Sequence, residues 1–252
     1  YKDVVDAYHH VTATTVDEEV NLMRDCLWNN IGVTYVGENE AYPQWVLDKS
    51  QEKRYMYRYI KVWVQLMSST YQPDSHWVLK TPSHSYFLPT VEEEFPDANL
   101  VFIHRDPTNV VASACQLNLV AGLSRVDYHK LDPARHGERV MHFLKVGTDL
   151  IREFQEAGSP AAQRAFHIRY EELTGDPIGS VERMYDHFGY EMTDEFRGKM
   201  AEHLGQNRQY KHGKPTYSLE QFGLSKEKVR AAFAEYTETF RPEPVAPSVN
   251  GQ

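Results

Sequence analysis

The sequence predicts an α/β protein in which helices flank a parallel sheet. Three short apolar runs, 77–79, 100–103 and 165–168, each come after a turn signal and before a helical pattern. Apolar runs without polar alternation are typical of strands that are buried on both faces of a parallel sheet. Strands that alternate with helices are the order of an α/β fold.

The bulk composition predicts a globular protein with one domain over residues 1–240 and a disordered, Pro-containing tail over 241–252. Hydrophobic residues make up 41% of the 252 residues, and every apolar window is interrupted by a charge or a proline before it reaches the roughly 18 residues of a membrane span. Cys26 and Cys115 lie inside helical patterns, which favours packing roles over a disulfide framework. A reducing, cytoplasmic compartment is therefore expected.

The charge balance argues against a nucleic-acid partner. A formal net charge of −9 does not suit broad phosphate neutralisation, so any bound anion must be met by local cations. The twelve histidines show neither His-Glu-x-x-His spacing nor a Cys-x-x-Cys companion, and no metal site is expected from them.

Two helical patterns precede the first apolar run. Capping-box spacing from Thr15 to Glu18 predicts a helix that continues to Asn29, with Leu27 on its apolar face. A longer pattern covers 44–69, and its stripe of apolar and aromatic residues has the spacing of one helix face. Core packing is favoured over an aromatic substrate platform for this stripe, which consists of Tyr55, Tyr59, Val62 and Leu66.

The helices of the second part have clear start signals. Pro89 predicts that the helix after the first strand begins no earlier than Tyr86 or is kinked. Asp106-Pro107 and Asp176-Pro177 each place an N-cap before a proline at the first helical position. Further helices are expected over 133–157, ending at Gly158, over 193–204, and over 226–240.

Charged and nucleophilic side chains gather at the expected strand ends. Lys80 follows the first strand, His84 lies on the turn into the next helix, and Arg105 precedes a capped helix that carries Ser113. Such a placement suits an anionic ligand, with Lys80 and Arg105 as cations and His84 as a proton acceptor near neutral pH. Taken singly, a solvated lysine, a structural ion pair of Arg105 with Asp106 or another carboxylate, and a non-catalytic histidine are equally ordinary interpretations.

One segment resembles a known nucleotide site. His104-Arg-Asp-Pro107, followed by Val110-Val-Ala-Ser113, is similar to the 3′-phosphate-binding segment of sulfotransferases that use 3′-phosphoadenylyl sulfate. In that family an Arg and a Ser eight residues apart hold the 3′-phosphate, and Arg105 and Ser113 have this spacing. The resemblance implies a P-loop NTPase-like sulfotransferase fold.

Further matches follow in the family's order over roughly 75–240. The 77–84 segment and Phe95-Pro-Asp-Ala98 resemble the bacterial-type family, and Arg169-Tyr-Glu-Glu-Leu173 is similar to an element whose Tyr approaches the adenine, which implies that role for Tyr170. A final segment with Tyr217-Ser-Leu-Glu-Gln-Phe-Gly-Leu224 resembles the part of the family that closes over the nucleotide. The resemblance thereby assigns nucleotide binding to the basic loop of Lys211, His212, Gly213 and Lys214.

The sequence departs from the family pattern in two ways. A Pro-Arg-Ser-Gly-Thr-Thr-like loop, which cradles the 5′-phosphosulfate in the family, does not occur in these 252 residues. The chain is therefore expected to correspond to the C-terminal two thirds of such an enzyme, with the loop preceding Tyr1. His84 also comes four residues after Lys80, whereas in the cytosolic steroid and phenol sulfotransferases the catalytic His comes two residues after the Lys. This difference makes the assignment of His84 as the base less direct.

The implied activity is transfer of a sulfuryl group from 3′-phosphoadenylyl sulfate to a hydroxyl or amine of a small-molecule acceptor, with His84 as base and Lys80 stabilising charge, and without a metal. A P-loop-type phosphotransferase and a non-catalytic nucleotide-binding module remain the alternatives. A protein kinase is excluded, because Asn109 comes three residues after Asp106 where the catalytic loop requires five. Aromatic residues that could line the acceptor pocket, or simply pack in the core, are Tyr42, Trp45, Tyr55 and Tyr57.

Overall fold

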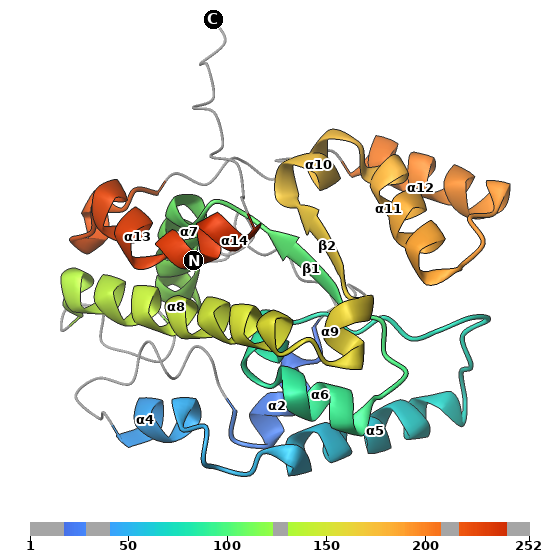
Figure 1. The fold of residues 1–252 in the computed structure, drawn as a ribbon, viewed down its shortest axis with the longest axis horizontal. Coiled ribbons are helices and arrows are strands. Elements are labelled where there is room, and N and C mark those ends of the chain that lie inside the picture. Colours follow the sequence, from blue (N-terminus) through green and yellow to red (C-terminus); the bar gives the residue numbers. More distant parts are fainter. Residues whose placement is uncertain (1–17, 29–40, 123–130, 208–216, 241–252) are drawn as a thin grey trace, which may run out of the picture.

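The protein is described by a computed structural model that covers residues 18–28, 41–122, 131–207 and 217–240. Within these ranges two parallel strands, β1 (Val101–His104) and β2 (Phe166–Arg169), lie at the centre with helices around them (Figure 1). The predicted α/β class with a parallel sheet is confirmed, as are two of its three strands.

The chain crosses from β1 to β2 through three helices, because parallel strands cannot be joined by a tight turn. These are α7 (Pro107–Gly122), α8 (Pro133–Ala157) and α9 (Pro160–Arg164). After β2 come α10, at the end of that strand, and α11 and α12, which Figure 1 shows in orange to one side of the sheet, and then the C-terminal elements that cover α8. Their bounds are α10 Tyr170–Gly175, α11 Pro177–Phe188, α12 Asp194–Gln206, η3 Glu220–Phe222, α13 Lys226–Ala232 and α14 Ala234–Phe240.

Helix α8 has the predicted bounds. Asp132 accepts hydrogen bonds from the backbone of Ala134 and Arg135, and Gly158 ends the helix with a positive φ of 62°. Its 25 residues correspond to a length of about 37 Å, enough to reach both the η1–α6 segment and the C-terminal helices. At Gly137 an added Cβ would lie 2.3 Å from the carbonyl oxygen of Phe222, so η3 packs directly on the α8 backbone.

The first predicted strand, 77–79, is wrong. These residues are not in a helix or strand, and they pair with no other strand within the described ranges. Side chains hold this segment instead: the indole Nε1 of Trp77 donates to Ser68 Oγ at 3.1 Å, and the backbone N–H of Lys80, directly after the run, donates to Glu19 Oε2 at 2.8 Å.

Helix α2 (Val20–Asp25) is shorter than predicted, and Thr15 of the predicted capping box lies outside the described residues. Leu27 has a positive φ of 67°, and the backbone N–H of Trp28 reaches the carbonyl of Met23 at 3.0 Å. This is a Schellman ending with leucine at the position usually taken by glycine. Leu27 is consequently 70% exposed instead of lying on the buried face.

The long helix predicted over 44–69 is divided into α4 (Ala41–Leu47) and α5 (Arg54–Ser68). The ammonium of Lys53 stabilises the break, because it donates to the carbonyl oxygens of Trp45 and Asp48 at 3.2 and 2.9 Å. The predicted apolar stripe does not form the core, since three of its four members are exposed and the buried face of α5 lies elsewhere on the helix. The exposed members are Tyr55, Val62 and Leu66, and the buried residues are Met56, Tyr57 and Ile60.

The segment after Lys80 begins with a 3-10 helix, η1 (Pro82–Tyr86), and continues as α6 (Leu88–Glu94), with Pro89 in its first turn as expected. The last predicted helix is also divided, between α13 and α14 at Phe233.

Both cysteines are free, and burial raises the pKa of Cys115 to about 12. No helix within the described ranges combines the length and apolar character needed to cross a membrane.

The apolar interior has three parts. One lies between α2, α5, η1 and α6 around Trp28, a second joins α7 and α8 to the C-terminal elements around Val140, and a third packs α6, α8 and α9 against β1 around Phe102. Helix α8 contributes to all three, so it connects the segment that carries His84 with the helix that carries Ser113.

Candidate active site

Arg105 and Tyr170 meet at the carboxyl ends of the two strands. The strand register pairs His104 with Arg169, so the residues that follow, Arg105 and Tyr170, leave the sheet side by side. The guanidinium carbon of Arg105 lies 4.3 Å from the centroid of the Tyr170 ring, which is a cation–π contact. Two residues that were predicted to bind different parts of one nucleotide are therefore in contact.

The buried Nε of Arg105 has no hydrogen-bond partner among the described residues, and no carboxylate there forms an ion pair with this side chain. Asp106 is engaged elsewhere: its Oδ1 accepts from the backbone N–H and hydroxyl of Thr108, both at 2.9 Å, and its Oδ2 accepts from Asn109 at 3.2 Å. The N-cap prediction is confirmed. A buried donor without a partner fits an anionic ligand at this position.

The remaining predicted nucleotide-binding residues are Ser113 and the basic loop. Ser113 is partly buried on α7, and its side chain makes no hydrogen bond within the described part of the chain. The basic loop, with Lys211, His212, Gly213 and Lys214, lies outside the described residues.

Lys80 and His84 are brought together by the start of α2. The exposed ammonium of Lys80 forms an ion pair with Glu18, and the backbone N–H of Lys80 donates to Glu19 Oε2. The same Glu19 carboxylate contacts the His84 ring, with 2.5 Å between Oε1 and Nε2. Two adjacent acidic residues thus hold the two predicted catalytic residues.

The other ring nitrogen of His84 is also engaged, because Nδ1 lies 2.9 Å from the hydroxyl of Tyr57. Burial raises the pKa of Tyr57 well above its ordinary value, so this phenol stays protonated. Burial alone would raise the pKa of Glu19 as well, but hydrogen bonds from His84 and from the Lys80 backbone outweigh it, and the pKa is lowered. Glu19 is therefore a carboxylate at neutral pH.

Helix α8 connects the two parts of the site. The hydroxyl of Tyr86, at the end of η1, donates to the carbonyl of Phe143 at 2.7 Å, and the ring of His136 hydrogen-bonds the carbonyl of Cys115 on α7 at 2.9 Å. Phe143 and His136 are seven residues apart on α8, which corresponds to about 10 Å along its axis. The His84 and Ser113 segments are thus both fixed to one rigid element.

A chain of hydrogen bonds lies beneath Arg105. The amide of Gln155 donates to the carbonyl of Ala162, so its oxygen is left to accept from His167 Nε2 at 3.0 Å. His167 Nδ1 then accepts from His104 Nε2 at 2.8 Å, and His104 Nδ1 accepts from the hydroxyl of Tyr236 at 2.9 Å. This order requires both imidazoles to be neutral. Burial, with a smaller contribution from His167, lowers the pKa of His104 to about 3.

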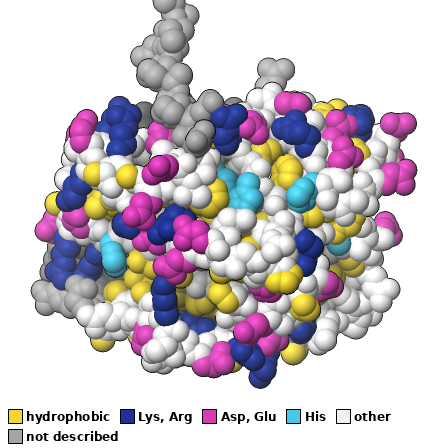
Figure 2. Space-filling view, viewed as in Figure 1, with side chains coloured by type: hydrophobic (Ala, Val, Ile, Leu, Met, Phe, Trp, Pro, Cys, Tyr) yellow, Lys and Arg dark blue, Asp and Glu magenta, His cyan; other side chains and the backbone are white. Residues whose placement is uncertain are grey.

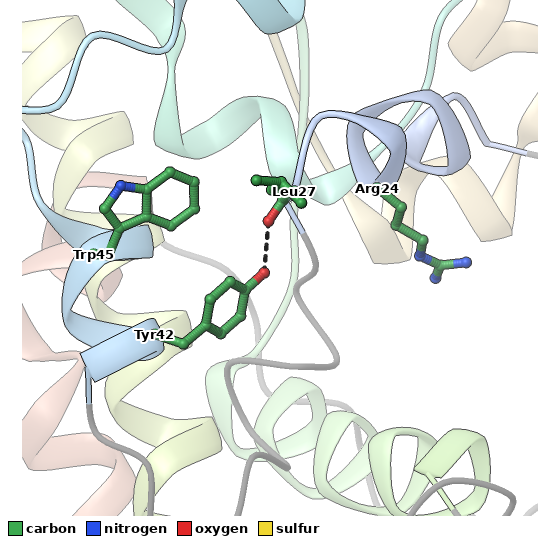
Figure 3. A pocket seen from close by; sticks show the side chains of 4 residues that line it. All are labelled: Arg24, Leu27, Tyr42 and Trp45. Atoms are coloured by element: carbon green, nitrogen blue, oxygen red, sulfur yellow. Dashed lines mark hydrogen bonds between the residues drawn. The ribbon is translucent and has the colours of Figure 1, made fainter.

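A pocket of about 440 Å³ lies at the opposite end of α2 from Glu19. Figure 3 shows its four lining residues, with the hydroxyl of Tyr42 donating to the carbonyl of Leu27 at 2.8 Å. The Tyr42 and Trp45 rings stack with 6.0 Å between their centroids, and Leu27 and Arg24 complete the lining. Of the aromatic residues considered for an acceptor pocket, Tyr42 and Trp45 line this one, whereas Tyr57 is buried beside His84.

The charges on the surface do not form one large basic area on the face drawn in Figure 2, where acidic and basic side chains are interspersed. Within the described ranges, no group of three or more His, Cys, Asp and Glu side chains is arranged to hold a metal ion.

Sequence reasoning did not find Glu18 and Glu19 as members of the site, and it considered Tyr57 for the acceptor pocket or the core but not as a partner of His84. Glu19 and His84 are 65 residues apart, and no local pattern predicts such a contact. Glu18 was visible only as the last residue of a helix-start signal.

The fold and the residues at its strand ends define an α/β protein with a cation and a buried donor at the carboxyl edge of a parallel sheet. The chain belongs to the sulfotransferase family, since residues 2–194 match the model of the group described as "Sulfotransferase family". The predicted family and fold are confirmed.

Characterised relatives agree with this assignment. Over 182 residues the chain is 28% identical to the omega-hydroxy-beta-dihydromenaquinone-9 sulfotransferase Stf3 of Mycobacterium bovis and of Mycobacterium tuberculosis, covering 69% of this chain and 45% of each relative. Among solved structures it is similar to sulfotransferase STF9 from Mycobacterium avium and STF1 from Mycobacterium tuberculosis. Both have a TM-score of 0.74 and 28% identity; the match covers 83% of this chain and 52% of STF9, and 90% of this chain and 57% of STF1. The chain thus spans about half the length of these relatives.

Proposed function

We propose that this chain provides the acceptor side and the 3′-phosphate side of a site that transfers a sulfuryl group from 3′-phosphoadenylyl sulfate to a small-molecule acceptor. The contact between Arg105 and Tyr170 carries the proposal: a guanidinium with a buried, unpartnered Nε within the described residues lies against an aromatic ring at paired strand ends. A guanidinium can bind a phosphate and a flat ring can support an adenine, so this pair suits two parts of one nucleotide.

In this proposal Arg105 and the hydroxyl of Ser113 bind the 3′-phosphate, and Tyr170 supports the adenine. The loop of Lys211, His212, Gly213 and Lys214 covers the nucleotide. Arg105 supplies charge-assisted hydrogen bonds, and Ser113 supplies a hydroxyl donor from the same helix that Asp106 caps.

His84 and Lys80 act on the transferred group. The donor supplies an activated sulfuryl group; the bond from its sulfur to the acceptor oxygen or nitrogen forms as the bond to the phosphate oxygen breaks, and the acceptor proton passes to His84. Lys80 places its exposed ammonium where negative charge collects on the moving group. None of these roles uses a metal ion.

The acceptor is proposed to be an alcohol with an apolar part that occupies the pocket of Arg24, Leu27, Tyr42 and Trp45. Two observations support this choice. Stf3 is named for a hydroxylated dihydromenaquinone, and the pocket lies on the same helix as Glu19, roughly 10 Å from the His84 contact. Trp45→Ala is expected to raise the KM for such an acceptor while leaving nucleotide affinity unchanged.

A calorimetric titration with 3′-phosphoadenosine 5′-phosphate tests the nucleotide site. The unmodified protein is expected to bind, and Arg105→Ala to lose about 10- to 100-fold in affinity, since a charge-assisted hydrogen bond contributes about 1.5 to 3 kcal/mol. Arg230→Ala, at an exposed position on α13, is the matched control. If Arg105→Ala keeps its affinity within about twofold, the assignment of the anchor is wrong. Nucleotide binding without transfer to any alcohol would instead favour a non-catalytic module.

A further inference from the structure

The ring of His84 is held at both nitrogens by side chains that are more buried than itself. Glu19 Oε1 lies 2.5 Å from Nε2 and the Tyr57 hydroxyl lies 2.9 Å from Nδ1. The Glu19 side chain is 7% exposed and Tyr57 1%, against 22% for the His84 side chain. A partly exposed imidazole thus lies between a buried carboxylate and a buried phenol.

The carboxylate determines which ring nitrogen carries the proton. An ionised carboxylate can only accept hydrogen bonds, so Nε2 of His84 must donate to Glu19. In the neutral ring the lone pair is then on Nδ1, where the hydroxyl of Tyr57 donates to it. After protonation, Nδ1 can donate to the same oxygen once the hydroxyl hydrogen turns away, so both forms of the ring keep two hydrogen bonds.

The same carboxylate also fixes the neighbouring lysine. Glu19 Oε2 accepts from the backbone N–H of Lys80 at 2.8 Å, so one side chain joins the turn that presents Lys80 to the ring of His84. Glu18, the preceding residue, pairs with the Lys80 ammonium and is not among the groups that bond the His84 ring.

We propose that Glu19 is a positioning residue for His84: it holds the ring in the tautomer with the proton on Nε2, makes Nδ1 the nitrogen that accepts a proton, and balances the charge of the resulting imidazolium. The proton reaches Nδ1 through the hydroxyl of Tyr57, which gives its own proton to the ring and takes the incoming one. Its effect on turnover rests on the proposed function, whereas the tautomer it imposes does not. Carboxylates that hydrogen-bond a catalytic imidazole act in this way in other enzymes.

The test is the ¹⁵N spectrum of histidine-labelled protein at alkaline pH, where the two tautomers of a neutral imidazole have different shifts. His84 is assigned by comparison with His84→Gln. In the unmodified protein its signals are expected at the positions of the Nε2–H tautomer, and in Glu19→Gln at positions that average both tautomers. Glu18→Gln, which removes a charge from the same end of α2, is the matched control and is expected to leave the His84 signals unchanged.

A second variant keeps the test decisive if Glu19→Gln does not fold. Tyr57→Phe removes the partner of Nδ1, yet the tautomer is expected to stay on Nε2 because Glu19 determines it. A change of tautomer in Tyr57→Phe, or an unchanged tautomer in folded Glu19→Gln, overturns the proposal.

Turnover gives an independent readout wherever sulfuryl transfer is measured. Glu19→Gln is expected to lower kcat by about 100-fold or more, the range of acid–base contributions, while the affinity for 3′-phosphoadenosine 5′-phosphate stays within about twofold. A loss of nucleotide affinity equal to the loss in kcat would point to a general structural role and contradict the proposal. Absence of nucleotide binding in the unmodified protein would overturn the proposed function and leave the tautomer result to decide this inference.

Discussion

The guanidinium of Arg105 lies 4.3 Å from the ring centroid of Tyr170 because the sheet register places His104 opposite Arg169. The two residues are 65 positions apart in the sequence, yet each is the first residue after its strand. Neighbouring strands are about 4.8 Å apart, so side chains that follow paired strand ends are within contact distance. A basic side chain is thereby held in place by an aromatic ring without an ion pair among the described residues.

Tyr170→Ala is expected to weaken binding of 3′-phosphoadenosine 5′-phosphate, by about 3- to 30-fold, because the variant loses both the ring that orders Arg105 and the surface proposed for adenine. A cation–π contact contributes about 0.5 to 2 kcal/mol, which sets this range. Tyr170→Phe keeps the ring and should stay within about twofold of the unmodified protein. Calorimetry separates the two variants, and equal affinities for both would contradict the role of the ring.

The two Asp-Pro helix starts should differ in their contribution to stability. Asp106 is buried and accepts three hydrogen bonds, so Asp106→Ala is expected to lower the free energy of unfolding by about 2 kcal/mol. Asp176 is exposed and accepts one backbone hydrogen bond, from Gly179 at 3.0 Å, and Asp176→Ala should cost about 1 kcal/mol or less. Urea unfolding measures both losses. Equal losses would show that burial of the Asp106 carboxylate adds nothing.

The sequence predicts those parts of the structure that depend on neighbours along the chain. Asp106, Asp132 and Asp176 each cap a helix through hydrogen bonds to residues two or three positions away, and Gly158 ends α8 through its own backbone conformation. The β1 and β2 strands are visible as apolar runs for the same reason. Family resemblance then places Arg105 and Tyr170 in one site, where the structure brings them into contact.

Features that depend on distant partners could not be predicted in this way. The run at 77–79 has strand composition, but Glu19 takes the backbone donor of the following residue, Lys80. The face of α5 that is buried was determined by what packs on it, so the stripe with Val62 is exposed and Tyr57 is in the core. The contact between Glu19 and His84 joins residues from separate elements, and no local spacing indicates it.

Replacing glycine by alanine at two helix positions should change the free energy of unfolding in opposite directions. At Gly137 of α8 the new methyl group would lie 2.3 Å from the carbonyl oxygen of Phe222, so the backbone of η3 must move, and Gly137→Ala is expected to cost about 1 to 3 kcal/mol of unfolding free energy. At Gly198 of α12 no atom lies within 4 Å of the added Cβ. Gly198→Ala should therefore stabilise the protein by about 0.5 to 1 kcal/mol. Denaturant unfolding checks both, and a stabilised Gly137→Ala would contradict the close packing of η3 on α8.

The pair of buried His104 and partly buried His167 makes stability depend on pH. In the folded protein the pKa of His104 is lowered to about 3, mainly by burial, whereas an unfolded histidine has a pKa of about 6.5. Between these two values the unfolded chain binds a proton that the folded chain does not, so this group's contribution to stability is complete above about pH 6.5 and is lost as the pH falls towards 3. From His104 alone, the free energy of unfolding is expected to fall by about 1.4 kcal/mol for each pH unit in this range. His167, whose pKa is also lowered by burial, makes this fall steeper.

Unfolding by urea at a series of pH values measures this slope. His104→Phe retains an aromatic ring between His167 and Phe240, with which His104 stacks, but removes the titrating group. The variant is expected to be less stable near pH 7, because the hydroxyl of Tyr236 loses its acceptor, and to lose stability less steeply between pH 6.5 and 4. Parallel curves for the variant and the unmodified protein would show that His104 takes up a proton in the folded protein as readily as in the unfolded chain, which the donor order from Tyr236 to Gln155 does not permit.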